Sequence, residues 1–112
     1  MNRNQLKEIL NQLKKELGIQ ELIKLELKPM KTKAASISLR KSTIRINKNI
    51  IPNLDTECIK YLLLHELIHY KLKSTYHNGE FHKQLANEID ENKAKQLERK
   101  ILTTLLQLNH IL

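Results

Sequence analysis

CIKYLLLHELIHY, residues 58–70, is the stretch of sequence that decides the fold. It is apolar on nearly every side, which is typical of a helix that crosses the middle of a small domain. It contains the pattern H-E-x-x-H as His65-Glu66-Leu67-Ile68-His69. Residues four apart on a helix lie on the same face, so the two imidazoles can converge on one zinc ion. Polar rings at the end of an apolar helix need such a partner.

Glu66 gives the pattern its chemical meaning. Its position is rotated about 100° from His65 around the helix, so its carboxylate can hold a water molecule on the zinc without binding the metal itself. We therefore expect His65 and His69 to bind one catalytic Zn²⁺ and Glu66 to act as the general base. The pattern favours a hydrolase over a pair of ordinary core or surface histidines.

The residues before this helix predict an N-terminal helix and a small antiparallel sheet. Residues 21–27 alternate apolar and charged side chains, which is the period of a half-buried strand, and Pro29 ends it. Alternation on both sides of Arg40-Lys41-Ser42 predicts a hairpin. Residues 3–17 are expected to be an amphipathic helix that stops at Gly18. Its apolar stripe consists of Leu6, Ile9, Leu10, Leu13 and Leu17.

The remaining residues predict helices and one loop. The central helix is expected from about residue 54 to about residue 72, with Asn53 or Asp55 as its N-cap. The polar segment 73–79 is a loop that returns the chain toward the metal. Apolar residues four apart predict a helix over 80–89 and another from 97 onward, with a bend or break at 90–93. The fold class is α+β, with one small domain spanning residues 1–112.

Composition limits the class of protein. A chain of 112 residues can build one domain with a modest core. Its single cysteine, Cys58, excludes an intrachain disulfide and a cysteine-rich zinc ribbon, and we interpret it as a core residue.

The charge and the ends of the chain bear on its partners. The 20 Lys and Arg give a net charge of +8, but they are spread over every segment, so we expect no nucleic-acid partner. The N-terminal residues are polar, and no apolar run approaches the about 20 residues of a membrane span. We therefore expect a cytoplasmic protein without a membrane partner.

The third zinc ligand must come from beyond His69, because a catalytic zinc usually takes three protein ligands and a water molecule. His77 is favoured, since a turn through Gly79 could swing its imidazole onto the metal while Phe81 anchors the next helix in the core. A glutamate from a later helix would complete the set in a different pattern. The alternatives are therefore Glu88 and Glu91, followed by Glu80 and His82.

Two further roles are open. Negative charge on a tetrahedral intermediate needs a second donor, for which the candidates are Tyr70, Tyr76 and His82. The apolar tail, residues 105–112, contains His110, which could occupy the cleft if the tail folds back or enters a neighbouring molecule. The alternative is a frayed or dimer-packing helix end.

On these residues the chain resembles the small archaeal H-E-x-x-H peptidases known as minigluzincins. The resemblance covers the hairpin, the H-E-x-x-H helix and the segment from His77 to Phe81. It implies that a strand before the zinc helix binds substrate backbone as an added strand, here Thr43 to Asn47 or its hairpin partner. It also implies inhibition by a terminal segment or by self-association into a homo-oligomer. Gluzincins use Glu as the third ligand, whereas the run H-x-x-x-F here favours His77.

We therefore expect a zinc-dependent endopeptidase that hydrolyses peptide bonds of unfolded or extended protein substrates. The alternative is a non-catalytic zinc-binding structural or regulatory domain, against which Glu66 argues, because a structural site needs no base. A basic nucleic-acid-binding module is a second rival, against which the spread of charge argues.

Overall fold

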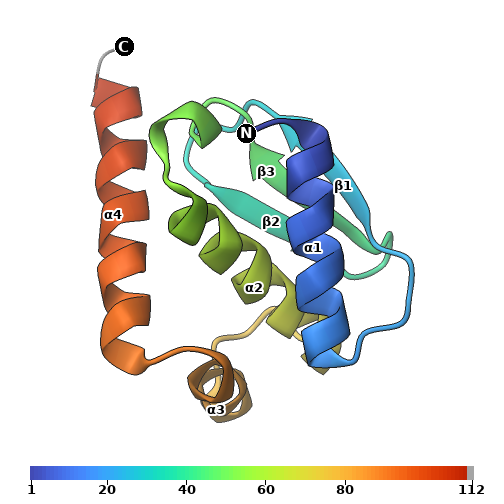
Figure 1. Ribbon diagram of the computed structural model, residues 1–112. Coiled ribbons are helices and arrows are strands. Elements are labelled where there is room, and N and C mark those ends of the chain that lie inside the picture. The colour runs from blue at the N-terminus through green and yellow to red at the C-terminus, as the bar shows by residue number, and fades with distance from the viewer. Residues whose placement is uncertain (111–112) are drawn as a thin grey trace.

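The computed structural model describes residues 1–110, without the side chain of His110. In chain order the elements are α1 (Arg3–Leu17), β1 (Lys24–Lys28), β2 (Ala35–Ser38), β3 (Thr43–Asn47), a short 3-10 turn (Ile51–Asn53), α2 (Thr56–Leu72), α3 (Gly79–Glu88) and α4 (Glu91–His110). The helices α1 and α2 lie against one face of the sheet, and α4 runs beside α2 (Figure 1). The predicted α+β class is confirmed.

Helix α1 has the predicted bounds because both of its ends are capped. The Asn2 side chain accepts a hydrogen bond from the backbone N–H of Gln5, and the Gln5 side chain accepts one from the N–H of Asn2. Gly18 ends the helix in the left-handed region with a φ of 72°. Its apolar stripe is buried against α2 and the sheet, through Leu6, Leu10, Leu13 and Leu17.

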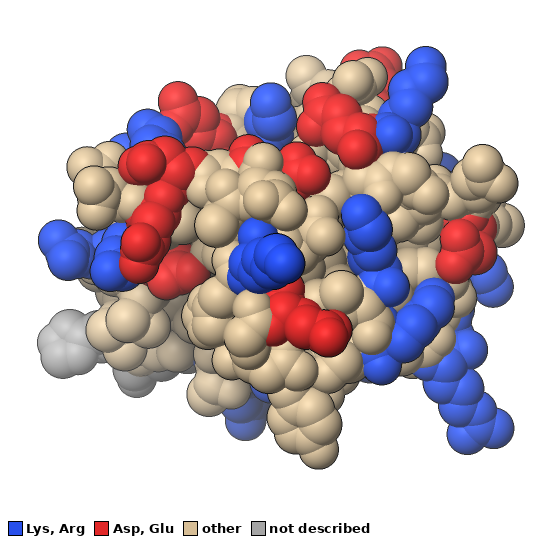
Figure 2. Space-filling model, turned by 90° about the horizontal axis from the view of Figure 1, so that it is seen from below, with Lys and Arg blue, Asp and Glu red and all other residues tan. Residues whose placement is uncertain are grey.

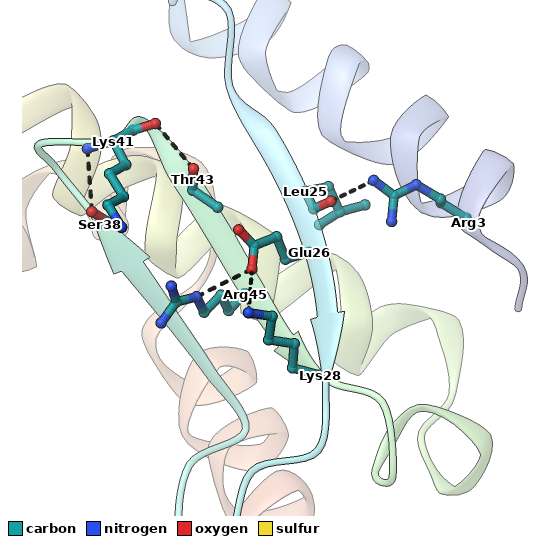
Figure 3. Close-up of polar contacts among 8 residues, drawn as sticks. All are labelled: Arg3, Leu25, Glu26, Lys28, Ser38, Lys41, Thr43 and Arg45. Atoms are coloured by element: carbon teal, nitrogen blue, oxygen red, sulfur yellow. Dashed lines mark hydrogen bonds and ion pairs between the residues drawn. The ribbon is translucent and has the colours of Figure 1, made fainter.

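The sheet is mixed, with strand order β1-β3-β2. The predicted hairpin is confirmed, since β2 pairs antiparallel with β3. The strand predicted at 21–27 lies at Lys24–Lys28 and pairs parallel with β3, so only the hairpin is antiparallel. The reason is the connection 29–34, which carries the chain across the end of β3 to the opposite edge. On the face away from the helices, the carboxylate oxygen Oε2 of Glu26 on β1 lies 3.4 Å from Nε of Arg45 on β3 (Figure 3).

Asn47 holds this crossing connection in place. Its side chain is 1% exposed, and its amide nitrogen donates to the carbonyl oxygens of Met30 and Lys33 at 2.8 and 3.1 Å. Its amide oxygen accepts from the backbone N–H groups of Met30 and Asn49. A buried amide saturated in this way stabilises one backbone path, and that path determines where β2 begins.

Helix α2 crosses the core as predicted, and 11 of its 17 residues are buried. It begins at Thr56 because Asp55, one of the two predicted caps, accepts a hydrogen bond from the N–H of Cys58. It ends at Leu72, followed by Lys73 in the left-handed region with a φ of 52°. Cys58 is buried, as predicted.

After α2 the chain forms two helices, α3 and α4, with a break at Ile89 and Asp90. The carboxylate of Asp90 accepts a hydrogen bond from the N–H of Lys93, so α4 begins at Glu91, six residues before the predicted start at Leu97. Seen from below, the surface carries Lys and Arg interspersed with Asp and Glu (Figure 2).

Candidate metal centre and cleft

Three imidazole rings meet beside the second half of α2. His65 and His69 come from successive turns of the helix, and His77 comes from the loop between α2 and α3. Nε2 of His77 lies 3.1 Å from Nε2 of His69 and 3.2 Å from Nε2 of His65. Two nitrogens bound tetrahedrally to zinc at about 2.0–2.1 Å are about 3.3 Å apart. The three rings therefore fit one metal ion.

The position of His77 follows from the ends of the two flanking helices. The left-handed turn at Lys73 stops α2, and Asn78 accepts a hydrogen bond from the N–H of Phe81 to start α3. Phe81 is 1% exposed, and its ring stacks on His69 at 4.4 Å between centroids. It also meets the edges of His65 and His77, each at 4.9 Å. The prediction that Phe81 anchors the helix after the turn in the core is confirmed.

Hydrogen bonding and burial prepare the rings for a metal. Nδ1 of His69 lies 2.9 Å from the carbonyl oxygen of Ser74, and because a carbonyl only accepts, this nitrogen carries the proton. The lone pair of Nε2 is then directed at the other two rings. Burial is the main cause that lowers the pKa of both His69 and His77. Neutral imidazole is the form that binds metal ions.

Glu66 lies next to the three rings but does not belong to their cluster. Its side chain is 7% exposed, and Oε1 lies 3.4 Å from Nδ1 of His65. The carboxylate lines the same cleft as His65, His69 and His77. A buried carboxylate beside a metal-binding cluster is placed to exchange protons with a group in the cleft.

The cleft has a volume of about 440 Å³ and opens to solvent. Helix α2 forms its floor, the strand β2 with the preceding residues 33–34 forms one wall, and α4 forms the other wall. The lining from α4 consists of Glu98, Ile101, Leu102 and Leu105. An extended peptide could therefore lie between a strand edge and an apolar helix face.

The other residues predicted for the site lie elsewhere within the described chain. Glu80, His82, Glu88 and Glu91 are outside the cluster of potential ligands. Tyr70, Tyr76 and His82 do not line the cleft. The Tyr70 hydroxyl forms a hydrogen bond with the Ser42 hydroxyl, and Tyr76 is 76% exposed. His82 lines a different hollow, together with Glu91. The side chain of His110 and residues 111–112 lie outside the described residues, so the predicted role of the tail stays a prediction.

Two cleft residues were not found from the sequence. The hydroxyl of Tyr61 donates a hydrogen bond to the Glu98 carboxylate, which joins α2 to α4 inside the cleft. Tyr61 precedes His65 by one helical turn, a spacing that could have placed it on the metal side of α2. Glu98 gave no signal, because only the packing of α4 directs it into the cleft.

Comparison with known proteins identifies relatives over nearly the whole chain. Residues 2–101 match the YgjP-like metallopeptidase domain. The protein MJ0123 of Methanocaldococcus jannaschii is 41% identical over 105 residues, which cover 94% of this chain and 96% of the relative. Crystal structures of two metallopeptidase zymogens are similar to this fold. Jannalysin of Methanocaldococcus jannaschii has a TM-score of 0.84 at 41% identity, covering 94% of both chains. Abylysin of Pyrococcus abyssi has a TM-score of 0.83 at 31% identity, covering 90% of this chain and 95% of its own.

None of the helices in the described part of the chain combines the length and the apolar character that crossing a bilayer requires.

Proposed function

The chain belongs to the YgjP-like metallopeptidase family, and from that premise we propose that it is a zinc-dependent endopeptidase acting on unfolded or extended protein segments. As a metallopeptidase it hydrolyses peptide bonds, and its substrates are proteins or peptides. The observation that carries the proposal is the cleft in which three converging imidazoles lie beside the buried carboxylate of Glu66.

His65, His69 and His77 are the proposed metal ligands. Nε2 of His77 lies 3.1 Å from Nε2 of His69 and 3.2 Å from Nε2 of His65. This spacing suits a tetrahedral ion that keeps its fourth position for another ligand. Zinc fits this donor set, because imidazole is one of its preferred ligands and three protein ligands are typical of its catalytic sites. When bound, the ion would polarise a carbonyl group and increase the acidity of a water molecule.

Glu66 is the proposed general base and acid. It takes a proton from the attacking water and returns that proton to the amine that leaves. Its burial in the floor of the cleft keeps the carboxylate close to the reacting groups and away from bulk water. General acid–base catalysis of this kind typically contributes about 10²- to 10⁴-fold in rate.

The strand β2 is the proposed binding edge for substrate backbone. Of the two strands considered from the sequence, β3 is paired on both sides, so only its hairpin partner β2 has an open edge. The N–H of Asn47 donates to the carbonyl of Ala34, and antiparallel pairs alternate between bonded and non-bonded positions. The backbone groups of Ala35 and Ile37 therefore face the cleft side, where an extended peptide can bond them as an added strand.

Latency is the proposed form of control, either through the C-terminal segment or through self-association into a homo-oligomer. Two structurally similar relatives are metallopeptidase zymogens. In this chain, α4 lines the cleft and also exposes Leu102 and Leu106 at 56% and 59%. A helix that offers apolar side chains to both the cleft and solvent could cover the site in either way.

The test is cleavage of a chemically unfolded protein by the full chain, before and after chelation and after readdition of zinc, over a dilution series. Activity that chelation removes and zinc restores supports the endopeptidase. Specific activity that rises on dilution supports inhibition by self-association. Activity that appears only after removal of residues 109–112 supports inhibition by the C-terminal segment. One bound zinc with no cleavage under any of these conditions would favour the non-catalytic zinc-binding domain.

A further inference from the structure

Glu98 is an acidic cleft residue that the proposed peptidase chemistry does not use. It lies on α4, and its carboxylate accepts a hydrogen bond from the hydroxyl of Tyr61. Tyr61 is 3% exposed, and burial raises the pKa of its phenol, so the hydroxyl keeps its proton and donates it. A rigid, buried donor therefore holds the Glu98 carboxylate at the cleft wall.

Among the side chains that the structure describes, the carboxylate has no cationic partner, since none of their ion pairs includes Glu98. This is notable in a chain that has 20 Lys and Arg against 12 Asp and Glu. Among the residues that line the cleft, Lys33 is the one Lys or Arg, and it belongs to the opposite wall, just before β2. A carboxylate has room for about four hydrogen bonds, and Tyr61 uses one. Glu98 is exposed, so its other acceptor positions face solvent, where a ligand in the cleft can reach them.

The neighbours of Glu98 on α4 are apolar. Ile101, Leu102 and Leu105 line the cleft at positions three, four and seven residues further along the same helix face. A long side chain with an apolar stem and a cationic end matches this surface, because its methylene groups can lie on the leucines while its charged end reaches the carboxylate. Lysine and arginine have this form, and arginine can bond a carboxylate through two N–H groups.

The geometry points to Glu98 as a specificity-determining residue: we propose that it selects a lysine or arginine side chain of the substrate close to the cleaved bond. The proposal rests on the proposed peptidase function for its location in a substrate cleft. Tyr61 lies one helical turn, about 5.4 Å, before His65, and an extended peptide advances about 3.3 Å per residue. The selected side chain therefore lies within about two residues of the bond held at the three histidines.

The experiment uses zinc-loaded full-length protein and peptides that are identical except at positions within two residues of the cleaved bond, where Lys, Arg, Met or Glu is placed. The readout is the ratio of kcat/KM for the Lys or Arg peptide to that for the Met peptide. Its variants are Glu98→Gln, which keeps an acceptor for Tyr61 but removes the charge, and Tyr61→Phe, which removes the donor but keeps the charge. Glu8→Gln, on the exposed side of α1, is the charge-matched control.

The wild-type protein and the Glu8→Gln control should prefer the basic peptides by about tenfold to a hundredfold, as expected for hydrogen bonds to a charged group. Glu98→Gln should lower kcat/KM for the Lys and Arg peptides toward the value for the Met peptide, so that the ratio falls to about one. Tyr61→Phe should retain most of the preference. If Glu98 only docks α4 onto α2, Tyr61→Phe and Glu98→Gln should behave alike, and that result would overturn the proposal. A wild-type enzyme without basic preference would also overturn it.

A binding measurement separates failure of this proposal from failure of the peptidase function. The same peptides are titrated against zinc-loaded Glu66→Gln protein, with and without Glu98→Gln, and followed by fluorescence anisotropy. Tighter binding of the basic peptides that disappears with Glu98→Gln supports the selection even if no form of the protein cleaves. Equal binding of basic and Met peptides contradicts it even if the wild-type protein is an active peptidase.

Discussion

Nε2 of His77 lies 3.1 Å from Nε2 of His69, although His69 belongs to α2 and His77 to the following loop. Two ring nitrogens at this distance without a shared proton or metal would set their lone pairs against each other. The contact is stabilised from behind by Phe81, which stacks on His69 and meets the edge of His77. The loop therefore brings a third imidazole to the two that the helix carries.

His77→Ala should remove the bound metal, whereas His82→Ala should retain it. His77 contributes a nitrogen to the cluster, while His82 lies outside it. Loss of a residue that merely orients a ligand typically lowers metal affinity about 10- to 100-fold, and loss of a ligand should cost more than that. The measurement is zinc content and competition with a chromogenic chelator. If His77→Ala retained zinc and His82→Ala lost it, the third ligand would be His82 and not His77.

The sequence predicted this cluster better than it predicted the rest of the cleft. His65 and His69 are related by the helical period alone, and Phe81 signalled that the turn after His77 is anchored. The cleft walls carry no such local signal, because they depend on the packing of distant elements. Glu98 faces Tyr61 across 37 residues of sequence, a distance at which periodicity carries no information.

Ala35→Pro should weaken substrate binding without affecting the fold, whereas Ser36→Pro should lower the stability of the fold. The N–H of Ala35 faces the open edge of β2, so its loss should leave the fold intact and raise KM for extended peptides. The N–H of Ser36 faces β3, so its loss should break a ladder bond and lower the free energy of unfolding. Thermal unfolding and peptide kinetics test the pair. Unchanged KM in a folded Ala35→Pro protein would argue against backbone binding at β2.

Asn47→Ala should lower the free energy of unfolding by about 2–4 kcal/mol, since it leaves buried backbone groups without partners. The affected groups are the N–H and carbonyl of Met30, the carbonyl of Lys33 and the N–H of Asn49. Loosening of the connection 29–34 should also raise KM, because it positions β2. Asn49→Ala is the matched control, since the side chain of Asn49 is exposed. Equal unfolding midpoints in urea for the two variants would contradict this role of Asn47.

The elements were largely predictable, but the arrangement of the strands was not. Helix α1 and the hairpin follow from periodicity and from local signals at Gly18 and around Ser42. The parallel pairing of β1 with β3 requires the crossing connection 29–34, which the side chain of Asn47 bonds from the end of β3. The sequence of the strand shows only that an asparagine ends an alternating apolar pattern, and it does not show which backbone groups that asparagine will bond.

The metal-free protein should lose stability as the pH falls from about 7 to 5. Burial holds the pKa of His69 and of His77 below the ordinary value of 6.5, at which these groups titrate in the unfolded chain. Between the two values the unfolded state binds more protons, so the free energy of unfolding rises with pH in this window. These two histidines contribute no further change above about pH 7.5. Urea titrations of chelated protein test this, and the double variant His69→Asn with His77→Asn should flatten the dependence. Greater stability at pH 5.5 than at pH 7.5 would contradict it.

Glu66→Gln provides the most direct measurement. Wild-type protein and this variant are each loaded with zinc and incubated with an unfolded protein substrate over a dilution series, and initial cleavage rates are compared with zinc content. We expect one zinc per chain in both proteins, cleavage by the wild type, and a rate at least about 10²-fold lower in the variant. Equal rates in the two proteins would contradict a peptidase built on His65, His69, His77 and Glu66. The same conclusion would follow if the full-length protein and a variant that lacks residues 109–112 each bound one zinc and neither cleaved the substrate.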